Sequence, residues 1–166
     1  HDMGYICRQA VAQQEQGAEI LDINVGVPGS NEEELMKKVV SAVRSVSDLP
    51  LQIDSSDPAA IEAGLRLAGG RSIVNSVNGK EESLKTILPI AKKYGAVVVG
   101  LALDENGIPE TSEGRVEIAK KIISRCEEAG IPRADIAIDC LTMTVGVDSE
   151  NPRITLSALE EVKKLG

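Results

Sequence analysis

Carboxylates and amides recur where short apolar runs of this sequence stop. Asp54, Asn75 and Asp139 each directly end such a run, and Asp22 and Asn24 close an earlier one. A carboxylate accepts two parallel N–H bonds from a planar edge, and an asparagine amide donates and accepts at once. These residue types favour a site for a planar polar heterocycle. Each position also has a structural interpretation, because Asp and Asn are common in turns and helix caps.

Other chemistries have weaker support in the residue pattern. A divalent metal competes for the carboxylates, but they are widely spaced and form no D-x-D or H-x-x-E cluster. The only histidine is His1, and Cys7, Cys126 and Cys140 are far apart, so neither a zinc site nor a disulfide framework is expected. Without a histidine base, Cys140 is expected to be a small core or loop residue. Dinucleotide, P-loop and nucleophile-elbow motifs are absent from the sequence.

The polar residues must be positioned by alternating strands and helices. Short β-branched runs predict buried strands at 19–24, 51–53, 72–75, 96–103 and 135–138. Stretches of helical period predict helices at 5–16, 31–47, 58–67, 81–94, 113–129 and 156–165. Expected N-terminal signals are Ser30-x-x-Glu33, Asp57-Pro58 and Asn78-x-x-Glu81, and expected C-terminal caps are Gly17, Gly95 and Gly130.

Three acidic residues have specific structural interpretations beside the functional one. Asp57 is expected to cap a helix and Asp104 to form a turn with the Glu-Asn-Gly that follows. For Asp22 two interpretations are equally open: a site residue, or a buried residue that fixes neighbouring loops.

Strands that alternate with helices imply right-handed crossovers and a parallel sheet. Two architectures fit this order: an open doubly wound sheet of five strands, or part of a (β/α)₈ barrel, which takes roughly 250 residues when complete. Periodicity alone does not decide between them. In both, ligands bind at the carboxyl edge of the strands, where the polar residues gather.

Composition excludes several partners. The 166 residues carry a net charge of −8 and include no Trp, no Phe and two Tyr. Binding to nucleic acid or to an anionic membrane is therefore not expected. The longest apolar run, 96–103, is too short to span a membrane. Cysteine usage fits a reducing cytoplasm.

Four segments together resemble the pterin-binding family: GAEILDINVG (17–26), LPLQIDSSDPAAIEAGL (49–65), IVNSVNGKEE (73–82) and KYGAVVVGLALDENGIP (93–109). Within it they are similar to the methyltetrahydrofolate-binding domains of cobalamin-dependent methyltransferases, methionine synthase included. The resemblance implies a (β/α)₈ TIM barrel, present here as a partial barrel of about five parallel strands. Dihydropteroate synthases share that fold, but the Arg-Pro-Gly segment usual in them is missing from 25–29.

The resemblance also implies site residues. In the family the Asp of the DSS segment, the Asn of the NS segment and a later Asp in I-D-P hold the pterin, which correspond here to Asp54, Asn75 and Asp139. Asn24 falls in the D-x-N segment near the same pocket. Cys140 stands where the family usually has Pro, so the loop after Asp139 is expected to be looser than in the family.

Family members carry a further strand before residue 1 and others after Gly166, including a Ser-Asn segment whose Asn is directed at the reactive pterin N5. Residues 1–166 are therefore expected to be a fragment of a single pterin-binding domain, inactive alone and prone to form a homo-oligomer through its open edges.

The implied activity is transfer of the N5 methyl of 5-methyltetrahydrofolate to cob(I)alamin on a corrinoid-binding domain or protein. No metal is expected in this chain. The alternatives are a dihydropteroate synthase-like enzyme and a non-catalytic pterin-binding module.

Overall fold

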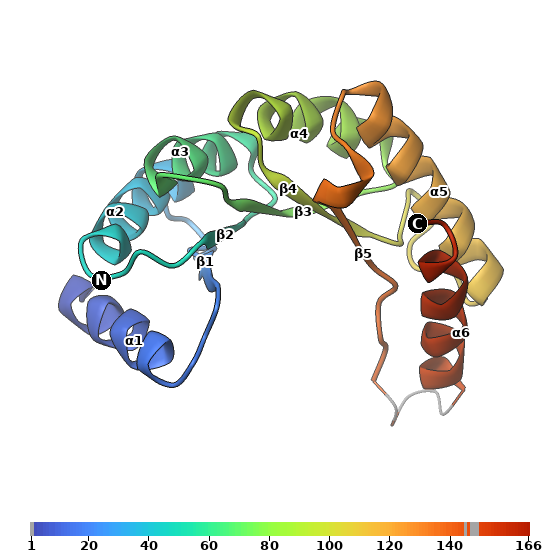
Figure 1. Cartoon of the computed structure of the whole chain (residues 1–166), viewed down its shortest axis with the longest axis horizontal. Helices are drawn as coiled ribbons and strands as arrows, with labels where there is room; N and C mark the ends of the chain where they lie inside the picture. Colours follow the sequence, from blue (N-terminus) through green and yellow to red (C-terminus); the bar gives the residue numbers. More distant parts are fainter. Residues whose placement is uncertain (1, 145, 147–149) are drawn as a thin grey trace. The chain divides into compact units, whose positions relative to one another are not determined.

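A computed structural model describes residues 2–144, 146 and 150–166 and shows helices alternating with strands (Figure 1). The strands are β1 (Leu21–Asn24), β2 (Leu51–Asp54), β3 (Ile73–Asn78), β4 (Val97–Leu101) and β5 (Ile136–Asp139). The helices are α1 (Met3–Glu15), α2 (Glu32–Arg44), α3 (Pro58–Ala68), α4 (Glu81–Tyr94), α5 (Ser112–Glu128) and α6 (Asn151–Lys163), with a 3-10 turn at Arg133–Asp135.

The strands form one parallel sheet in the order β1-β2-β3-β4-β5. The order of a doubly wound sheet reverses at a switch point, whereas neighbouring barrel strands follow one another along the chain. The sequential order therefore confirms the barrel expectation over the doubly wound one. By contacts, the chain divides into two compact units, the first comprising residues up to Asn75 with Lys93–Val97 and the second comprising Ser76–Lys92 and residues from Val98 onward.

In the first unit, α1, α2 and α3 follow one another beside β1 and β2 (Figure 1). Strand residues alternate between the two faces, and Leu21, Ile23, Leu51 and Ile53 are buried. The other face of these strands carries polar residues. Helix α3 approaches β2 closely at Gly64, because a Cβ built there would lie 2.8 Å from Ile53 Cγ2.

The helix starts in this unit agree only partly with the sequence. Asp57 caps α3 as expected, since its carboxylate accepts from the N–H of Ala59 at 2.9 Å. The capping box expected at Ser30 is wrong, because Asn31 caps α2 and accepts from the N–H of Glu34 at 3.1 Å. Asparagine and serine are about equally good N-cap residues, so residue type alone does not show which of these two neighbouring positions caps the helix.

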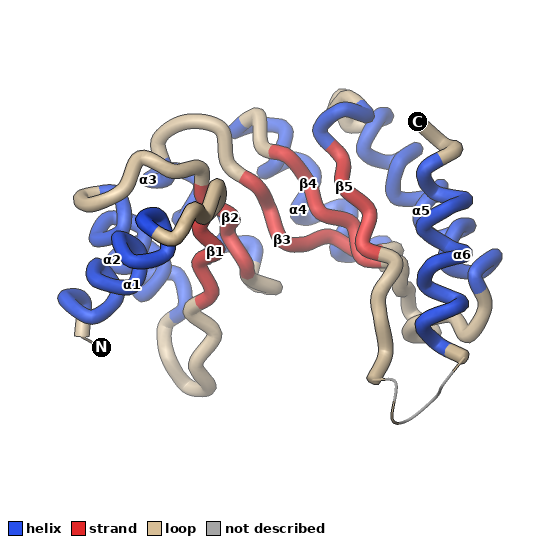
Figure 2. Tube along the Cα trace, turned by 60° about the horizontal axis from the view of Figure 1, so that its bottom comes forward, coloured by secondary structure: helices blue, strands red, loops and turns tan. Residues whose placement is uncertain are grey.

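In the second unit, α5 and α6 pack side by side, which is plain in Figure 2. A small apolar cluster joins them to the end of β5: Val116, Cys140 and Ala158, with Ile138 and Val162 packed against it. Helix α6 begins at Asn151, five residues before the expected start at 156. Pro152 lies in the first turn of α6, where proline is favoured. The spacing of apolar residues, from which the start was predicted, does not contain this signal.

The start of α4 corrects a second capping prediction. Asn78 is the last residue of β3 and accepts from the N–H of Lys80, so it does not cap the helix. The N–H of Glu81 instead donates to Glu105 in the loop after β4, at 3.0 Å. This long-range partner could not be read from the local sequence. The expected glycine caps are confirmed at Gly17, Gly95 and Gly130, which all have positive φ.

Glu81 also anchors α4 to α5 through ion pairs, and replacing it should make stability less dependent on pH. Its carboxylate lies 2.7 Å from Arg125 and 3.0 Å from Lys121. Hydrogen bonds from these two side chains lower the pKa of Glu81 from 4.5 to about 2. Stabilisation by a carboxylate with a lowered pKa is present above the unfolded pKa and is lost as pH falls through the folded pKa. We expect Glu81→Gln to be less stable than the wild type at pH 7, with a difference that shrinks between pH 4.5 and about 2.

Urea unfolding of the intact protein across this pH range measures the effect. The neighbouring Glu82→Gln is the matched control and should change stability little at any pH. A difference between wild type and Glu81→Gln that stays constant with pH would show that the ion pairs contribute nothing measurable.

Candidate functional site

Three of the predicted residues lie in one row across β1, β2 and β3. Asn24 and Asp54 end β1 and β2 as expected, but the prediction that Asn75 ends a strand is wrong, because β3 continues past it to Asn78. Asn24 is the register partner of Asp54, and Asp54 is the register partner of Asn75. Residues in register on parallel strands point to the same face, and neighbouring strands are about 4.8 Å apart. The Asn24–Asp54–Asn75 row therefore presents its side chains across roughly 10 Å of one sheet face.

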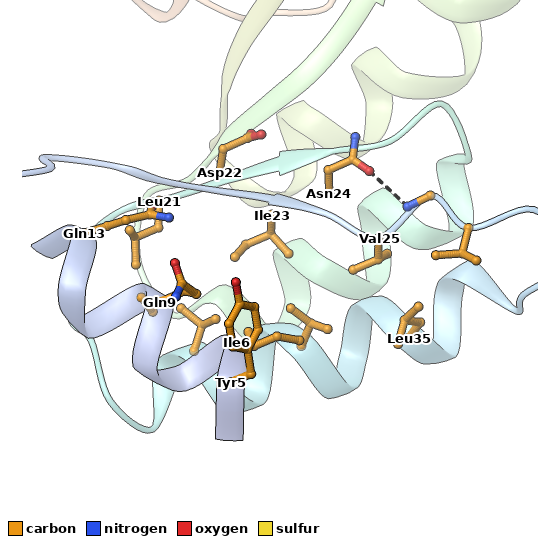
Figure 3. A pocket seen from close by; sticks show the side chains of 15 residues that line it. Tyr5, Ile6, Gln9, Gln13, Leu21, Asp22, Ile23, Asn24, Val25 and Leu35 are labelled. Carbon is orange, nitrogen blue, oxygen red and sulfur yellow. Dashed lines mark hydrogen bonds between the residues drawn. The ribbon is translucent and has the colours of Figure 1, made fainter. Parts of the chain in front are cut away.

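Within the row, Asn24 fixes the orientation of Asp54. The Asn24 amide donates through Nδ2 to Asp54 Oδ2 at 2.8 Å. Its Oδ1 accepts from the N–H of Gly26 at 3.0 Å, the contact dashed in Figure 3. A flipped amide would lose both bonds, so the two contacts assign the amide orientation. Asn24 thus holds one oxygen of Asp54 and leaves the other carboxylate oxygen available.

The loop after Asp54 is held by the next residue. Ser55 is buried, and its hydroxyl donates to Glu32 Oε1 at 2.5 Å and accepts from the N–H of Asp57 at 2.9 Å. The N–H of Ser55 donates to the backbone oxygen of Asn75 at 2.9 Å. These bonds tie the segment that follows β2 to the middle of β3, and they hold the backbone next to Asp54 and at Asn75.

Asn75 supplies a free amide beside Asp54. Its side chain is half-buried, and it makes no hydrogen bond to another side chain or backbone group among the described residues. A half-buried amide without partners is ready to bind a ligand group that both donates and accepts. Asp54 Oδ1 and the Asn75 amide together offer the donor and acceptor set that a planar heterocycle requires.

Asp139, the last residue of β5, belongs to the second unit and pairs in register with Leu101. It is exposed, and its Oδ1 accepts from the N–H of Leu141 at 2.8 Å. Leu141 has a positive φ of 59°, unusual for a residue with a side chain. The loop after Asp139 is thus sharply turned. That Asp139 contacts the same ligand as Asp54 and Asn75 stays a prediction.

Cys140 is a core residue, as expected. Its side chain is 1% exposed and packs in the cluster with Val116 and Ala158. Burial, reinforced by the charge of Asp139, raises the pKa of the Cys140 thiol. A raised pKa leaves little thiolate at neutral pH, so Cys140 is not activated as a nucleophile.

The other acidic candidates have structural contacts. Asp104 closes a turn with Gly107, with its carboxylate accepting from the N–H of Asn106 at 2.8 Å. Asp22 lies one layer below the row and accepts from the Gln52 side chain at 2.7 Å. Of the two interpretations of Asp22, the one in which it is buried and fixes loops is wrong, because Asp22 is exposed and its partner is a neighbouring strand residue.

A hollow of about 280 Å³ lies beneath β1, between that strand and helices α1 and α2 (Figure 3). Its wall is mostly apolar and includes Tyr5, Ile6 and Leu35. In Figure 3 the side chains of Asp22 and Asn24 point away from the helices, whereas Ile23 points toward them. Asp22 and Asn24 border the hollow, but most of its wall is formed by apolar residues of α1, α2 and the helix-facing side of β1, so it does not provide the planar polar contacts of the predicted site.

Among the described residues, no three His, Cys, Asp or Glu side chains are grouped so as to hold a metal ion. His1 lies outside those residues. None of the described helices is long and apolar enough to cross a membrane.

Sequence reasoning missed Arg115, a buried residue of the second unit that contacts the segment after Asp139. It is 1% exposed, and its guanidinium donates to the backbone oxygens of Cys140 and Leu141, which directly follow Asp139. A signal was present: Arg115, Ala119, Ile122 and Cys126 recur at the spacing of one helix face, and this places a cation in the apolar stripe of α5.

Two methionine synthases are similar to this chain in sequence. The enzyme of Mycobacterium leprae is 35% identical over 89% of this chain, and that of Mycobacterium tuberculosis is 35% identical over 92% of it. The chain spans only 13% and 14% of those relatives.

Solved structures of dihydropteroate synthases have the same fold. The enzyme from Stenotrophomonas maltophilia, with imidazole bound in its active site, has a TM-score of 0.78 at 24% identity over 99% of this chain and 64% of its own. The Thermus thermophilus enzyme in complex with 4-aminobenzoate has a TM-score of 0.74 at 22% identity over 96% of this chain and 64% of its own. These TIM-barrel neighbours confirm the fold class.

A family model described as "Pterin binding enzyme" matches residues 1–166. The match covers every residue of the polar row and both units, and it agrees with the sequential parallel sheet. The chain belongs to the family of pterin-binding enzymes.

Proposed function

We propose that this chain is the pterin-binding part of a methyltransferase that moves the N5 methyl of 5-methyltetrahydrofolate to cob(I)alamin on a corrinoid-binding domain or protein. The observation that carries the proposal is the Asn24–Asp54–Asn75 row, with Asp54 oriented by Asn24 at 2.8 Å and the Asn75 amide unengaged among described residues. The 35% identity to methionine synthases supports this activity.

The chemistry of the row fits a pterin. Asp54 Oδ1 accepts N–H groups from the pyrimidinone edge of the ring, and the Asn75 amide donates and accepts at adjacent ring positions. Asp139 is proposed to supply a further carboxylate. Hydrogen bonds to such groups would hold the planar ring in one orientation. A fixed orientation lowers the entropy cost of reaching the reactive geometry.

The residues of this chain are proposed to bind and orient, and the corrinoid, when present, supplies the nucleophile. Departure of the methyl group from a tertiary amine requires a proton or hydrogen bond at N5. None of the candidate residues is assigned to that step. Because the corrinoid would supply the nucleophile, this chain would need none of its own. This agrees with the position of Cys140 as a buried core residue.

A dihydropteroate synthase-like activity is the second candidate. The observation in its favour is the similarity in fold to several such enzymes, at identities of 19–24%. The segment 25–29 reads Val-Gly-Val-Pro-Gly, without the Arg-Pro-Gly usual in those enzymes. A pterin-binding module without catalysis is the third. The cytoplasm is the proposed location, because the cysteines are free thiols.

The test uses the intact protein with 5-methyltetrahydrofolate and cob(I)alamin, and follows loss of cob(I)alamin absorbance. We expect methylcobalamin to form at a rate that saturates with methyltetrahydrofolate. A parallel reaction supplies p-aminobenzoate and a pterin that carries a leaving group; condensation of the two with release of that group, without methyl transfer, would support the second candidate instead. Pterin binding without either reaction would support the non-catalytic module.

A further inference from the structure

Arg115 is a buried cation whose described partners are all neutral. Its side chain is 1% exposed. Nε donates to the backbone oxygen of Pro109 at 3.0 Å, and NH2 donates to Asn151 Oδ1 at 2.8 Å. NH1 lies 3.0 Å from the oxygen of Cys140, 2.5 Å from that of Leu141 and 3.0 Å from Thr155 Oγ1. Burying a charge is costly unless it is fully hydrogen-bonded, so this arrangement requires an explanation.

The acceptors come from three separate segments. Pro109 lies in the loop before α5, Cys140 and Leu141 directly follow β5, and Asn151 and Thr155 are in the first turns of α6. A planar guanidinium with donors in several directions joins such segments, whereas an apolar side chain would remove one donor from each of these oxygens. Arg115 therefore fixes the path of the chain as it leaves β5.

The connection continues to the carboxylate of Asp139. The Leu141 oxygen accepts from Arg115 and also from the Thr155 hydroxyl at 2.9 Å. The Leu141 N–H donates to Asp139 Oδ1 at 2.8 Å, while its φ of 59° is a conformation that residues with side chains rarely adopt. Arg115 and Thr155 thus hold the carbonyl of a strained residue whose N–H orients Asp139.

We propose that Arg115 is a positioning residue for the pterin site, acting through Leu141 to set the orientation of the Asp139 carboxylate. This inference rests on the proposed function in one respect, the proposed contact of Asp139 with the pterin. It assigns a task to a buried charge that no step of the proposed activity uses. The hydrogen bonds of Arg115 would also hold the sharp turn after Asp139 in this chain, in which Cys140 stands where the family usually has Pro.

The experiment replaces Arg115 in the intact protein. Arg115→Lys keeps the charge but loses the planar donor set, and Arg125→Lys on the same helix is the matched control. We expect Arg115→Lys to raise the Kd for 5-methyltetrahydrofolate by about tenfold or more, as misplacement of a binding group does. Arg125→Lys should leave the Kd unchanged. Thr155→Val, which removes the hydroxyl but keeps the shape, should weaken binding in the same direction and serves if Arg115→Lys fails to fold.

A double-mutant cycle separates positioning from general destabilisation. In an Asp139→Ala background, Arg115→Lys should have little further effect on the Kd while lowering thermal stability as much as it does alone. An undiminished effect on the Kd in that background, or no effect in the wild type, would overturn the proposal.

A ligand-free readout keeps this test apart from the proposed function. A crystal structure of Arg115→Lys should show Leu141 outside the left-handed region and the bond from its N–H to Asp139 lost. Retention of both would overturn the positioning role whatever the protein binds. Failure of the wild type to bind 5-methyltetrahydrofolate would instead overturn the proposed function and leave the structural result to decide the role of Arg115.

Discussion

Replacing Asp54 with alanine in the intact protein is expected to raise the Kd for 5-methyltetrahydrofolate by about one to two powers of ten. The physical reason is that ligand N–H groups and the Asn24 amide both lose the carboxylate that they would contact. A polar group buried without its partner costs about 1–3 kcal/mol, and each 1.4 kcal/mol is tenfold in Kd. Equilibrium fluorescence titration of the pterin measures the change.

Asp54→Asn is expected to be no better than alanine, although it has nearly the native shape. Asn24 Nδ2 donates to one oxygen of Asp54, so an asparagine at 54 would turn its own oxygen toward Asn24. Its NH2 group would then face the N–H edge of the pterin, donor against donor. If residue 54 acted only by filling space, Asp54→Asn would instead bind the pterin with near-native affinity.

The matched control is Asp48→Ala, which removes one carboxylate from an exposed position before β2 and should leave the Kd unchanged. It corrects for the change in net charge. Native affinity in folded Asp54→Ala and Asn75→Ala variants would remove both residues from the site and with them the observation on which the proposed function rests.

The positions of Asp54 and Asn75 could be predicted because they depend on strand periodicity and parallel register. Both properties are local or follow from a right-handed alternation of strand and helix. The pairing of Asn24 with Asp54 follows from the same register, since neighbouring strands bring these residues together. A resemblance to a known family then indicated which of these polar strand residues to expect in a ligand site.

The parts that could not be predicted depend on contacts between distant segments. The N–H at the start of α4 is satisfied by Glu105, which is 24 residues away, and not by Asn78. Arg115 contacts Leu141 and Thr155 across 26 and 40 residues. No local pattern specifies such partners. The apolar stripe of α5 indicated only that residue 115 faces inward.

Gly64→Ala is expected to destabilise the wild type but to become neutral or stabilising when Ile53 is alanine. A Cβ at Gly64 would lie 2.8 Å from Ile53 Cγ2, 3.1 Å from Met36 Cγ and 3.2 Å from Ile53 Cδ1. Overpacking of this kind costs about 1–3 kcal/mol, which exceeds the gain of about 1 kcal/mol from alanine in a helix. Ile53→Ala alone removes a fully buried side chain and should cost about 2–5 kcal/mol.

The sign reversal arises because truncating Ile53 removes the shortest contact of the new methyl group and leaves the flexible Met36 side chain, at 3.1 Å, to shift by a few tenths of an ångström. Urea unfolding of the four variants of this cycle measures it. Leu51→Ala provides the matched background, since Leu51 is equally buried on the same face of β2 but is not among the nearest atoms to Gly64. There Gly64→Ala should stay destabilising. Equal effects in the two backgrounds would show that Gly64 does not set the approach of α3 to β2, the strand that carries Asp54.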